Sequence, residues 1–155
     1  MKTLCLYYSR TSLTKEVMTR IAEGLEADLY EYTDGKDRSG ILGYLLACID
    51  SFRKYPEVMI KGLETPLEAY DRILVGMPVW AERPCVVGKA FLKQYAPQLK
   101  NVYLVVTHMA AVPYTKQILK LNDLLDTPAE GYLSVATGKG IDYTEVDAFI
   151  ERLRS

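Results

Sequence analysis

The sequence has little of what would place the protein in several specialised classes. Its 155 residues include only three cysteines, Cys5, Cys48 and Cys85, which are far apart and in no metal-ligand spacing. Buried reduced thiols are therefore expected, not a metal centre or a disulfide scaffold. No block of five or more like charges occurs, and 19 basic against 20 acidic side chains leave a net charge of −1. This balance provides no electrostatic footprint for nucleic acid or for an anionic membrane.

The sequence also lacks a long apolar run. Its longest stretch without Asp, Glu, Lys or Arg covers residues 101–115, contains His108 and Pro113, and falls short of the ~20 apolar residues of a membrane helix. Near the N-terminus only residues 4–8 are continuously apolar, and because no small-residue cleavage site follows, a secretory signal is not expected. We expect one globular domain over residues 1–155, located in the cytoplasm.

Five short segments have the pattern of strands. Four of them are apolar on both alternating faces, as in a parallel sheet that is covered on both sides: residues 4–8, 73–77, 102–106 and 132–136. The fifth, residues 28–33, alternates more clearly, which is typical of an edge strand.

Helical patterns separate these strands. Apolar side chains recur with a 3.6-residue period over residues 17–25, from about residue 86 to 92, over 118–125 and over 146–153. Such alternation predicts an α/β, doubly wound sheet with helices on both faces. Ligands of these sheets bind outside the carboxyl ends of the strands, so the loops that follow the strands are where a site is expected.

The longest connection, residues 34–68, contains one further helical pattern. Its apolar positions are Ile41, Leu42, Leu45, Leu46, Ile49 and Phe52. We interpret it as a crossover helix with extra loop. Several aromatic and basic residues could make it a lid or a docking surface, but a solvated helix face explains them equally well and is favoured: Tyr44, Tyr55, Lys36, Arg38, Arg53 and Lys54.

Four hydroxyl side chains lie within six residues after the first expected strand. The segment is Ser9, Arg10, Thr11, Ser12, Leu13 and Thr14, directly before an amphipathic helix. The free N–H groups and the positive dipole end of that helix favour an anion, and simple N-capping would need only one hydroxyl. We interpret the loop as a phosphate cradle. It contains neither a G-x-G-x-x-G nor a G-x-x-x-x-G-K-[ST] pattern, which argues against a dinucleotide or a triphosphate.

The only tryptophan, Trp80, follows the third buried strand within Gly-Met-Pro-Val-Trp-Ala-Glu-Arg-Pro, residues 76–84. We expect this segment to be a loop. An exposed indole between prolines suggests a stacking wall for a flat ligand, although a loop tryptophan often packs on its own domain.

Together these two loops resemble those of the flavodoxin family, specifically of short-chain proteins that bind flavin mononucleotide (FMN), and the resemblance covers nearly the whole chain. In that family a [ST]-x-T-G-x-T loop holds the FMN phosphate. Ser9, Thr11 and Thr14 match it, and Ser12 stands at the glycine position. A second loop in many relatives reads G-x-P-V-W-x-G-x-P and lines the isoalloxazine ring. The matching residues are Gly76, Pro78, Val79, Trp80 and Pro84, whereas Glu82 replaces the glycine.

The resemblance implies a five-stranded parallel sheet in the order 2-1-3-4-5 and FMN as the cofactor. The cofactor-binding residues that it implies are Ser9, Arg10, Thr11, Ser12, Leu13, Thr14, Pro78, Val79, Trp80, Ala81, Glu82, Thr107 and His108. A glycine-rich turn usually follows the fourth strand in the family, whereas this chain has Thr-His-Met-Ala-Ala. His108 would lie beside the ring, where an imidazolium could stabilise an anionic reduced flavin, or it is a surface histidine at a strand end.

The function that the resemblance implies is electron transfer by bound FMN, with a redox partner protein that supplies or accepts electrons. An FMN-dependent reductase of NAD(P)H or quinone type is the second possibility. A flavodoxin-like binding module that has lost FMN is the third, since three expected glycine positions are filled. The net charge of −1 predicts weak electrostatic steering towards partners. Both a monomer and a homodimer are compatible with the sequence.

Overall fold

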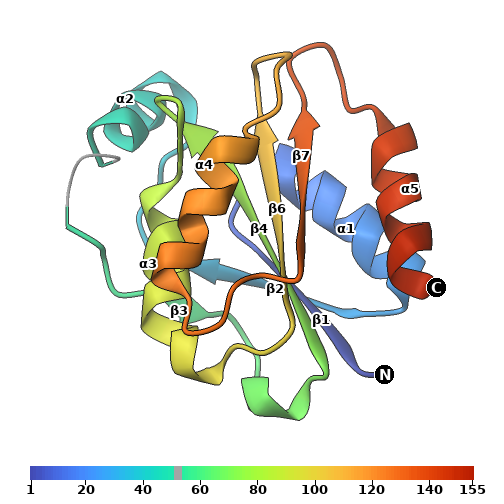
Figure 1. Cartoon of the computed structure of the whole chain (residues 1–155). Helices are drawn as coiled ribbons and strands as arrows, with labels where there is room; N and C mark the ends of the chain where they lie inside the picture. The colour runs from blue at the N-terminus through green and yellow to red at the C-terminus, as the bar shows by residue number, and fades with distance from the viewer. Residues whose placement is uncertain (51–53) are drawn as a thin grey trace.

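The computed structural model of the 155-residue chain describes residues 1–50 and 54–155. They form a mostly parallel sheet with helices on both faces (Figure 1). The strands are β1 (Thr3–Tyr7), β2 (Asp28–Thr33), β3 (Met59–Ile60), β4 (Arg72–Trp80), β5 (Arg83–Pro84), β6 (Val102–His108) and β7 (Gly131–Ala136).

The strand pairing differs from the expected all-parallel, five-stranded sheet. The parallel pairs are β1 with β2, β1 with β4, β4 with β6, and β6 with β7. Two further strands of two residues each pair antiparallel, β3 with β2 at the sheet edge and β5 with β4. The count of five strands was therefore wrong. Two-residue strands are too short to produce a periodicity that the sequence could reveal.

The helices are α1 (Leu13–Leu25), α2 (Gly40–Asp50), α3 (Val86–Tyr95), α4 (Thr115–Lys120) and α5 (Tyr143–Arg154). Single turns of 3₁₀ helix occur at η1 (Leu67–Ala69), η2 (Ala96–Gln98) and η3 (Leu121–Leu124). In Figure 1, α1 and α5 lie on one side of the sheet and α3 and α4 on the other, while α2 lies near the carboxyl ends of the strands. No helix within the described residues is long and apolar enough to cross a membrane.

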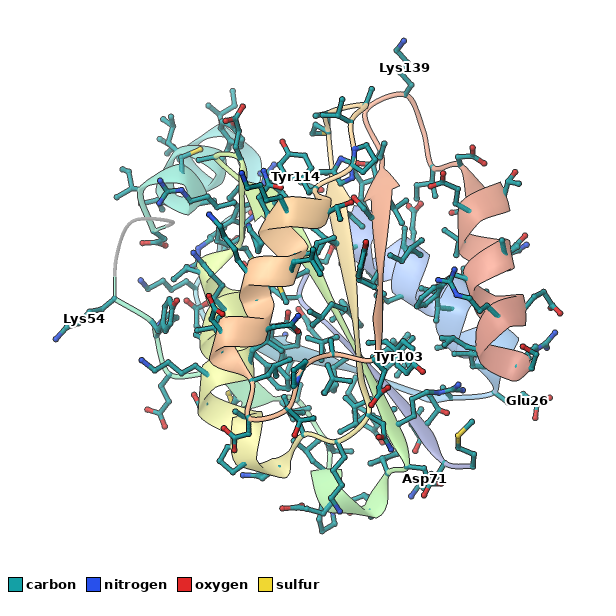
Figure 2. The ribbon with its side chains drawn as sticks, viewed as in Figure 1. Glu26, Lys54, Asp71, Tyr103, Tyr114 and Lys139 are labelled. Carbon is teal, nitrogen blue, oxygen red and sulfur yellow. The ribbon has the colours of Figure 1, made fainter. Side chains whose placement is uncertain are left out.

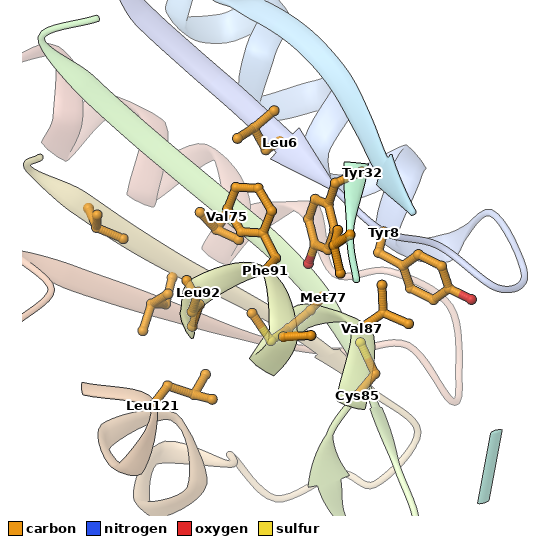
Figure 3. Close-up of a cluster of buried hydrophobic side chains, with 14 of the residues drawn as sticks. Leu6, Tyr8, Tyr32, Val75, Met77, Cys85, Val87, Phe91, Leu92 and Leu121 are labelled. Atoms are coloured by element: carbon orange, nitrogen blue, oxygen red, sulfur yellow. The ribbon is translucent and has the colours of Figure 1, made fainter. Parts of the chain in front are cut away.

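The sheet separates two apolar clusters. On the α3 side, the ring of Phe91 stacks on Tyr32 at 4.5 Å between centroids (Figure 3). On the α1 and α5 side, Met18 and Phe149 are fully buried. Each of these large side chains removes a substantial apolar area from water, and this burial is the main term that stabilises the sheet in place.

The three cysteines are free. Cys5 and Cys85 are buried, as predicted, and burial raises the pKa of both thiols to about 12. Cys85 also caps α3, because its Sγ accepts a hydrogen bond from the Gly88 N–H. Cys48 is only half-buried, so the prediction fails for this residue.

The expected crossover helix is present as α2, but its surroundings differ from the prediction. Arg38, which was assigned to a solvated surface, is buried. Only Gly43, Ala47 and Asp50 of α2 are buried, so most of its apolar side chains face solvent instead of a core. Phe52 and Arg53, which belonged to the same interpretation, lie outside the described residues.

Candidate functional site

The segment that joins β1 to α1, the end of β4 and the end of β6 meet at the carboxyl ends of the strands, where the alternation of strands and helices predicted a site. The buried hydroxyl oxygens of Thr14, in α1, and Thr107, in β6, lie 2.8 Å apart and share a hydrogen bond. This bond joins the loop after β1 to the end of β6. A cavity of about 80 Å³ lies beside it, lined by Arg10, Thr11, Leu13, Thr14, Tyr44, Pro78, Val79, Trp80, Thr107, His108, Met109 and Thr137.

Nine of the thirteen predicted site residues therefore lie around one cavity. The other four, Ser9, Ser12, Ala81 and Glu82, belong to the same loops but do not line it. The sequence interpretation missed three lining residues. Tyr44 comes from the long crossover and Met109 from the turn after β6, two segments that the sequence analysis considered without assigning these residues to the site, whereas Thr137, after β7, lay in no segment considered.

The end of the site that could bind an anion is the start of α1. Ser12 is the N-cap of this helix and has a left-handed backbone, with φ 70° and ψ −10°. This conformation is the one that glycine adopts at no steric cost, in agreement with the family pattern at this position. The Ser9 Oγ accepts a hydrogen bond from the Lys15 N–H at 3.4 Å. The N–H groups of Leu13 and Thr14, at the start of the helix, have no carbonyl partner within the helix and are available to an anion.

The segment after β4 is a hairpin and not the predicted loop. Trp80 pairs with Arg83 in the antiparallel ladder of β4 and β5, so Ala81 and Glu82 form a two-residue turn. Both turn residues have left-handed backbones, with φ 46° for Ala81 and 62° for Glu82. Hairpin turns of this kind favour Asn-Gly, so Ala81 stands where asparagine is preferred and Glu82 places a Cβ where glycine is preferred.

Trp80 is buried, which corrects the expectation of an exposed indole. Its side chain is 4% exposed and meets the Tyr8 ring edge-on, at 5.5 Å between centroids. Its indole N–H is buried without a hydrogen-bond partner among the described residues. Because an unpaired buried donor costs free energy, this N–H is a group that a bound ligand could satisfy.

A buried ionic cluster also contacts Trp80. The Arg38 guanidinium lies 5.2 Å from the Trp80 ring and donates hydrogen bonds to Asp34, at 2.7 and 2.8 Å, and to Asp50, at 2.8 and 3.0 Å. It also donates to the Tyr8 hydroxyl at 3.2 Å. Burial alone would raise the pKa of Asp34, but the hydrogen bonds from Arg38 and a backbone N–H lower it overall.

His108 is buried inside the domain, not exposed at the strand end. Its Nδ1 lies 2.8 Å from the Ala110 carbonyl, which can only accept, so Nδ1 carries the proton. Its Nε2 then accepts a hydrogen bond from the Ser134 hydroxyl at 2.7 Å. That hydroxyl oxygen accepts from the N–H of Tyr114, at the start of α4 (Figure 2). Burial lowers the pKa of His108, which favours neutral imidazole over the expected imidazolium.

The site fits an anionic group better than a large flat ring in its present shape. A cavity of about 80 Å³ can hold a phosphate-sized group, whereas cofactor sites usually enclose at least about 300 Å³. Tyr44 and Met109 are 51% and 71% exposed, so both can move away from the cavity with little loss of packing. Their displacement would open the ring end of the site beside the unpaired indole N–H of Trp80.

Within residues 1–50 and 54–155, no group of three or more His, Cys, Asp or Glu side chains is placed to hold a metal ion.

Comparisons with known proteins agree on one fold. No protein-family model and no curated protein sequence matches the chain. A flavoprotein from Lactobacillus acidophilus NCFM, solved in complex with FMN, is 26% identical over 95% of this chain and 97% of that chain, with a TM-score of 0.71. The apo-form of the flavoprotein from that organism is 23% identical over 86% and 91%, with a TM-score of 0.63. Oxidised flavodoxin 1 from Bacillus cereus is 15% identical over 98% and 94%, with a TM-score of 0.53.

Proposed function

We propose that this chain, a flavodoxin-like protein, binds FMN at the cavity between the loop after β1 and the ends of β4 and β6, and transfers electrons through it. One observation carries the proposal. Residues matching the phosphate loop and the ring loop of flavodoxins, which are far apart in the sequence, line one cavity in a fold shared with a flavoprotein solved with FMN.

The residues of the chain would divide the binding of FMN between them. The first-turn N–H groups of α1, together with the exposed hydroxyls of Thr11 and Ser12, would hold the phosphate. Trp80 would flank the ring, and its indole N–H would donate to a polar atom of the ligand. Thr14 and Thr107 already satisfy each other, so their role is to keep the two loops together. Bound FMN would supply the redox chemistry.

A role as an electron carrier is favoured over a role as an enzyme that reduces its own substrate, because the cavity has little room for a second substrate. A specific observation nevertheless favours the reductase as the second candidate. Arg83, Lys89 and Lys120, from three separate elements, line a further cavity of about 440 Å³, together with one acidic residue, Asp123. Such a basic cluster could bind the phosphates of a nicotinamide dinucleotide, and the sequence alone did not reveal it.

The deciding experiment is anaerobic reduction of the FMN-loaded protein. NADH or NADPH is added alone and then together with a flavodoxin reductase, and bleaching of the flavin absorption band is followed. We expect slow bleaching by the nicotinamide alone and rapid bleaching with the reductase. If the nicotinamide alone bleached the flavin rapidly and saturably, and Lys89→Glu lost this activity, the protein would be a reductase and not an electron carrier. A protein that stays colourless with added FMN would leave only the binding-module alternative.

A further inference from the structure

The most unusual surface of the molecule is helix α2. Six of its apolar side chains face solvent, and we call them the α2 patch: Ile41, Leu42, Tyr44, Leu45, Leu46 and Ile49. Their exposed fractions run from 49% for Leu46 to 83% for Ile41. Over its described residues 40–50 the helix has one charged side chain, Asp50, which is buried. A helix that is apolar around most of its circumference normally lies inside a protein.

Contacts with Arg38 at both ends hold the helix in this exposed position. Asp50 at its C-terminal end is bound by the buried guanidinium of Arg38. Near its N-terminal end, Gly43 lies so close to the Arg38 backbone that a Cβ would collide with the carbonyl oxygen. Buried ion pairs add little net stability, so this cluster is better explained by its positioning of α2 than by its contribution to folding.

The α2 patch is continuous with the cofactor cavity. Tyr44 belongs to the patch and also lines that cavity. Met109, in the loop after β6, lines the same cavity and is 71% exposed. Exposed apolar residues on an ordinary surface are scattered singly, whereas six large apolar side chains that are 49–83% exposed lie together on α2, which marks the patch as an interaction surface.

We propose that the α2 patch is the interface of a homodimer, in which α2 of a second copy packs against α2 and the loop after β6 and covers the mouth of the cofactor cavity. An apolar surface without charge pairs with an identical surface about a two-fold axis, whereas transient redox complexes rely on complementary charges. A net charge of −1 brings no repulsion between two copies. The closing of the cavity rests on the proposed function, but the interface itself does not.

The chemistry of α2 disfavours a membrane as the occupant. Helices that lie in a membrane surface combine an apolar face with a cationic face. The side of α2 opposite the patch consists of Gly43, Ala47 and Asp50, and it is covered by the domain. A lipid surface is therefore an outcome for the experiment to exclude.

The test is the mass of the intact protein in solution, measured by light scattering and sedimentation with and without FMN. We expect twice the 17.5 kDa of one chain. Leu46→Glu should weaken dimerisation by roughly 100-fold or more, because it places an unpaired charge in the interface. Leu119→Glu, on α4, is the matched control. Leu119 is also 49% exposed but lies outside the patch, so this variant should remain dimeric.

Each result bears on one of the two claims. A wild-type monomer at all concentrations, or a dimer that Leu46→Glu leaves intact, would overturn the interface. A monomer that floats with lipid vesicles would overturn it in favour of a membrane. FMN binding by a monomer would refute the interface and leave the proposed function standing. A dimer that does not bind FMN would refute the proposed function and leave the interface standing. Faster FMN release from Leu46→Glu than from Leu119→Glu would support the covering of the cavity.

Discussion

Replacing Glu82 by glycine should stabilise the folded protein. Glu82 is the second residue of the tight turn between β4 and β5, with φ 62°. Its side chain is exposed, so the substitution removes no packing. The stability change should therefore come almost entirely from the backbone.

The magnitude follows from two opposing terms. A non-glycine residue in the left-handed region costs about 1–2 kcal/mol, which the substitution recovers. Glycine makes the unfolded chain more flexible, and this costs about 0.4–1 kcal/mol. The expected net stabilisation is about 0.5–1 kcal/mol. For a domain of this size, that corresponds to a rise in Tm of about 1–4 °C.

Thermal unfolding followed by circular dichroism, supported by urea titration, measures this change. The matched control is Glu82→Ala, which removes the charge but keeps the Cβ, and its stability should stay within about 0.5 kcal/mol of the parent. If Glu82→Gly lowered the free energy of unfolding, the turn would not have the left-handed backbone described. If Glu82→Ala stabilised equally, the carboxylate and not the backbone would be the source.

Three further predictions follow from buried groups. Arg38→Ala should lower the free energy of unfolding by about 3–5 kcal/mol in urea titrations, because two buried carboxylates lose their counter-ion, and Arg38→Lys should not restore the bidentate bonds. Burial lowers the pKa of His108 below its ordinary 6.5, so the stability gained from neutral His108 is present above pH 6.5 and is lost as the pH falls through the lowered value. Unfolding midpoints from pH 8 to 5 should fall less steeply in His108→Asn. The buried thiols of Cys5 and Cys85 should react with a disulfide reagent more slowly than Cys48 in the folded protein, and all three should react equally in denaturant.

The sequence predicted the parts of the fold that follow from periodicity. The long strands and the helices α1, α3, α4 and α5 were found near their expected positions, because each presents an apolar face to the sheet. The hairpin at Ala81 and Glu82 escaped prediction because these residues carry none of the usual turn signals. The pattern of α2 was read as a helix, but periodicity does not say whether an apolar face is covered.

The sequence could predict those residues of the candidate site that belong to motifs, but not those whose position depends on contacts between distant parts of the chain. Thr11 and Thr14 line the cavity, and their interpretation as part of a phosphate cradle stays a prediction. The burial of Trp80 depends on Arg38, whose partners Asp34 and Asp50 come together only in the folded chain. Nothing in the sequence spacing of these charges distinguishes them from a solvated surface.

The most direct test of FMN binding through its phosphate is a comparison of FMN with riboflavin, which has the same ring but no phosphate. Titrations followed by flavin fluorescence should show FMN binding about 10–100-fold more tightly, the value of one strong charge-assisted hydrogen bond. Thr11→Asp should remove this preference by repelling the phosphate, whereas Thr127→Asp, an exposed position before the amino end of β7 and outside the cavity, should retain it. Equal affinities for the two flavins, or no binding of either, would contradict the account.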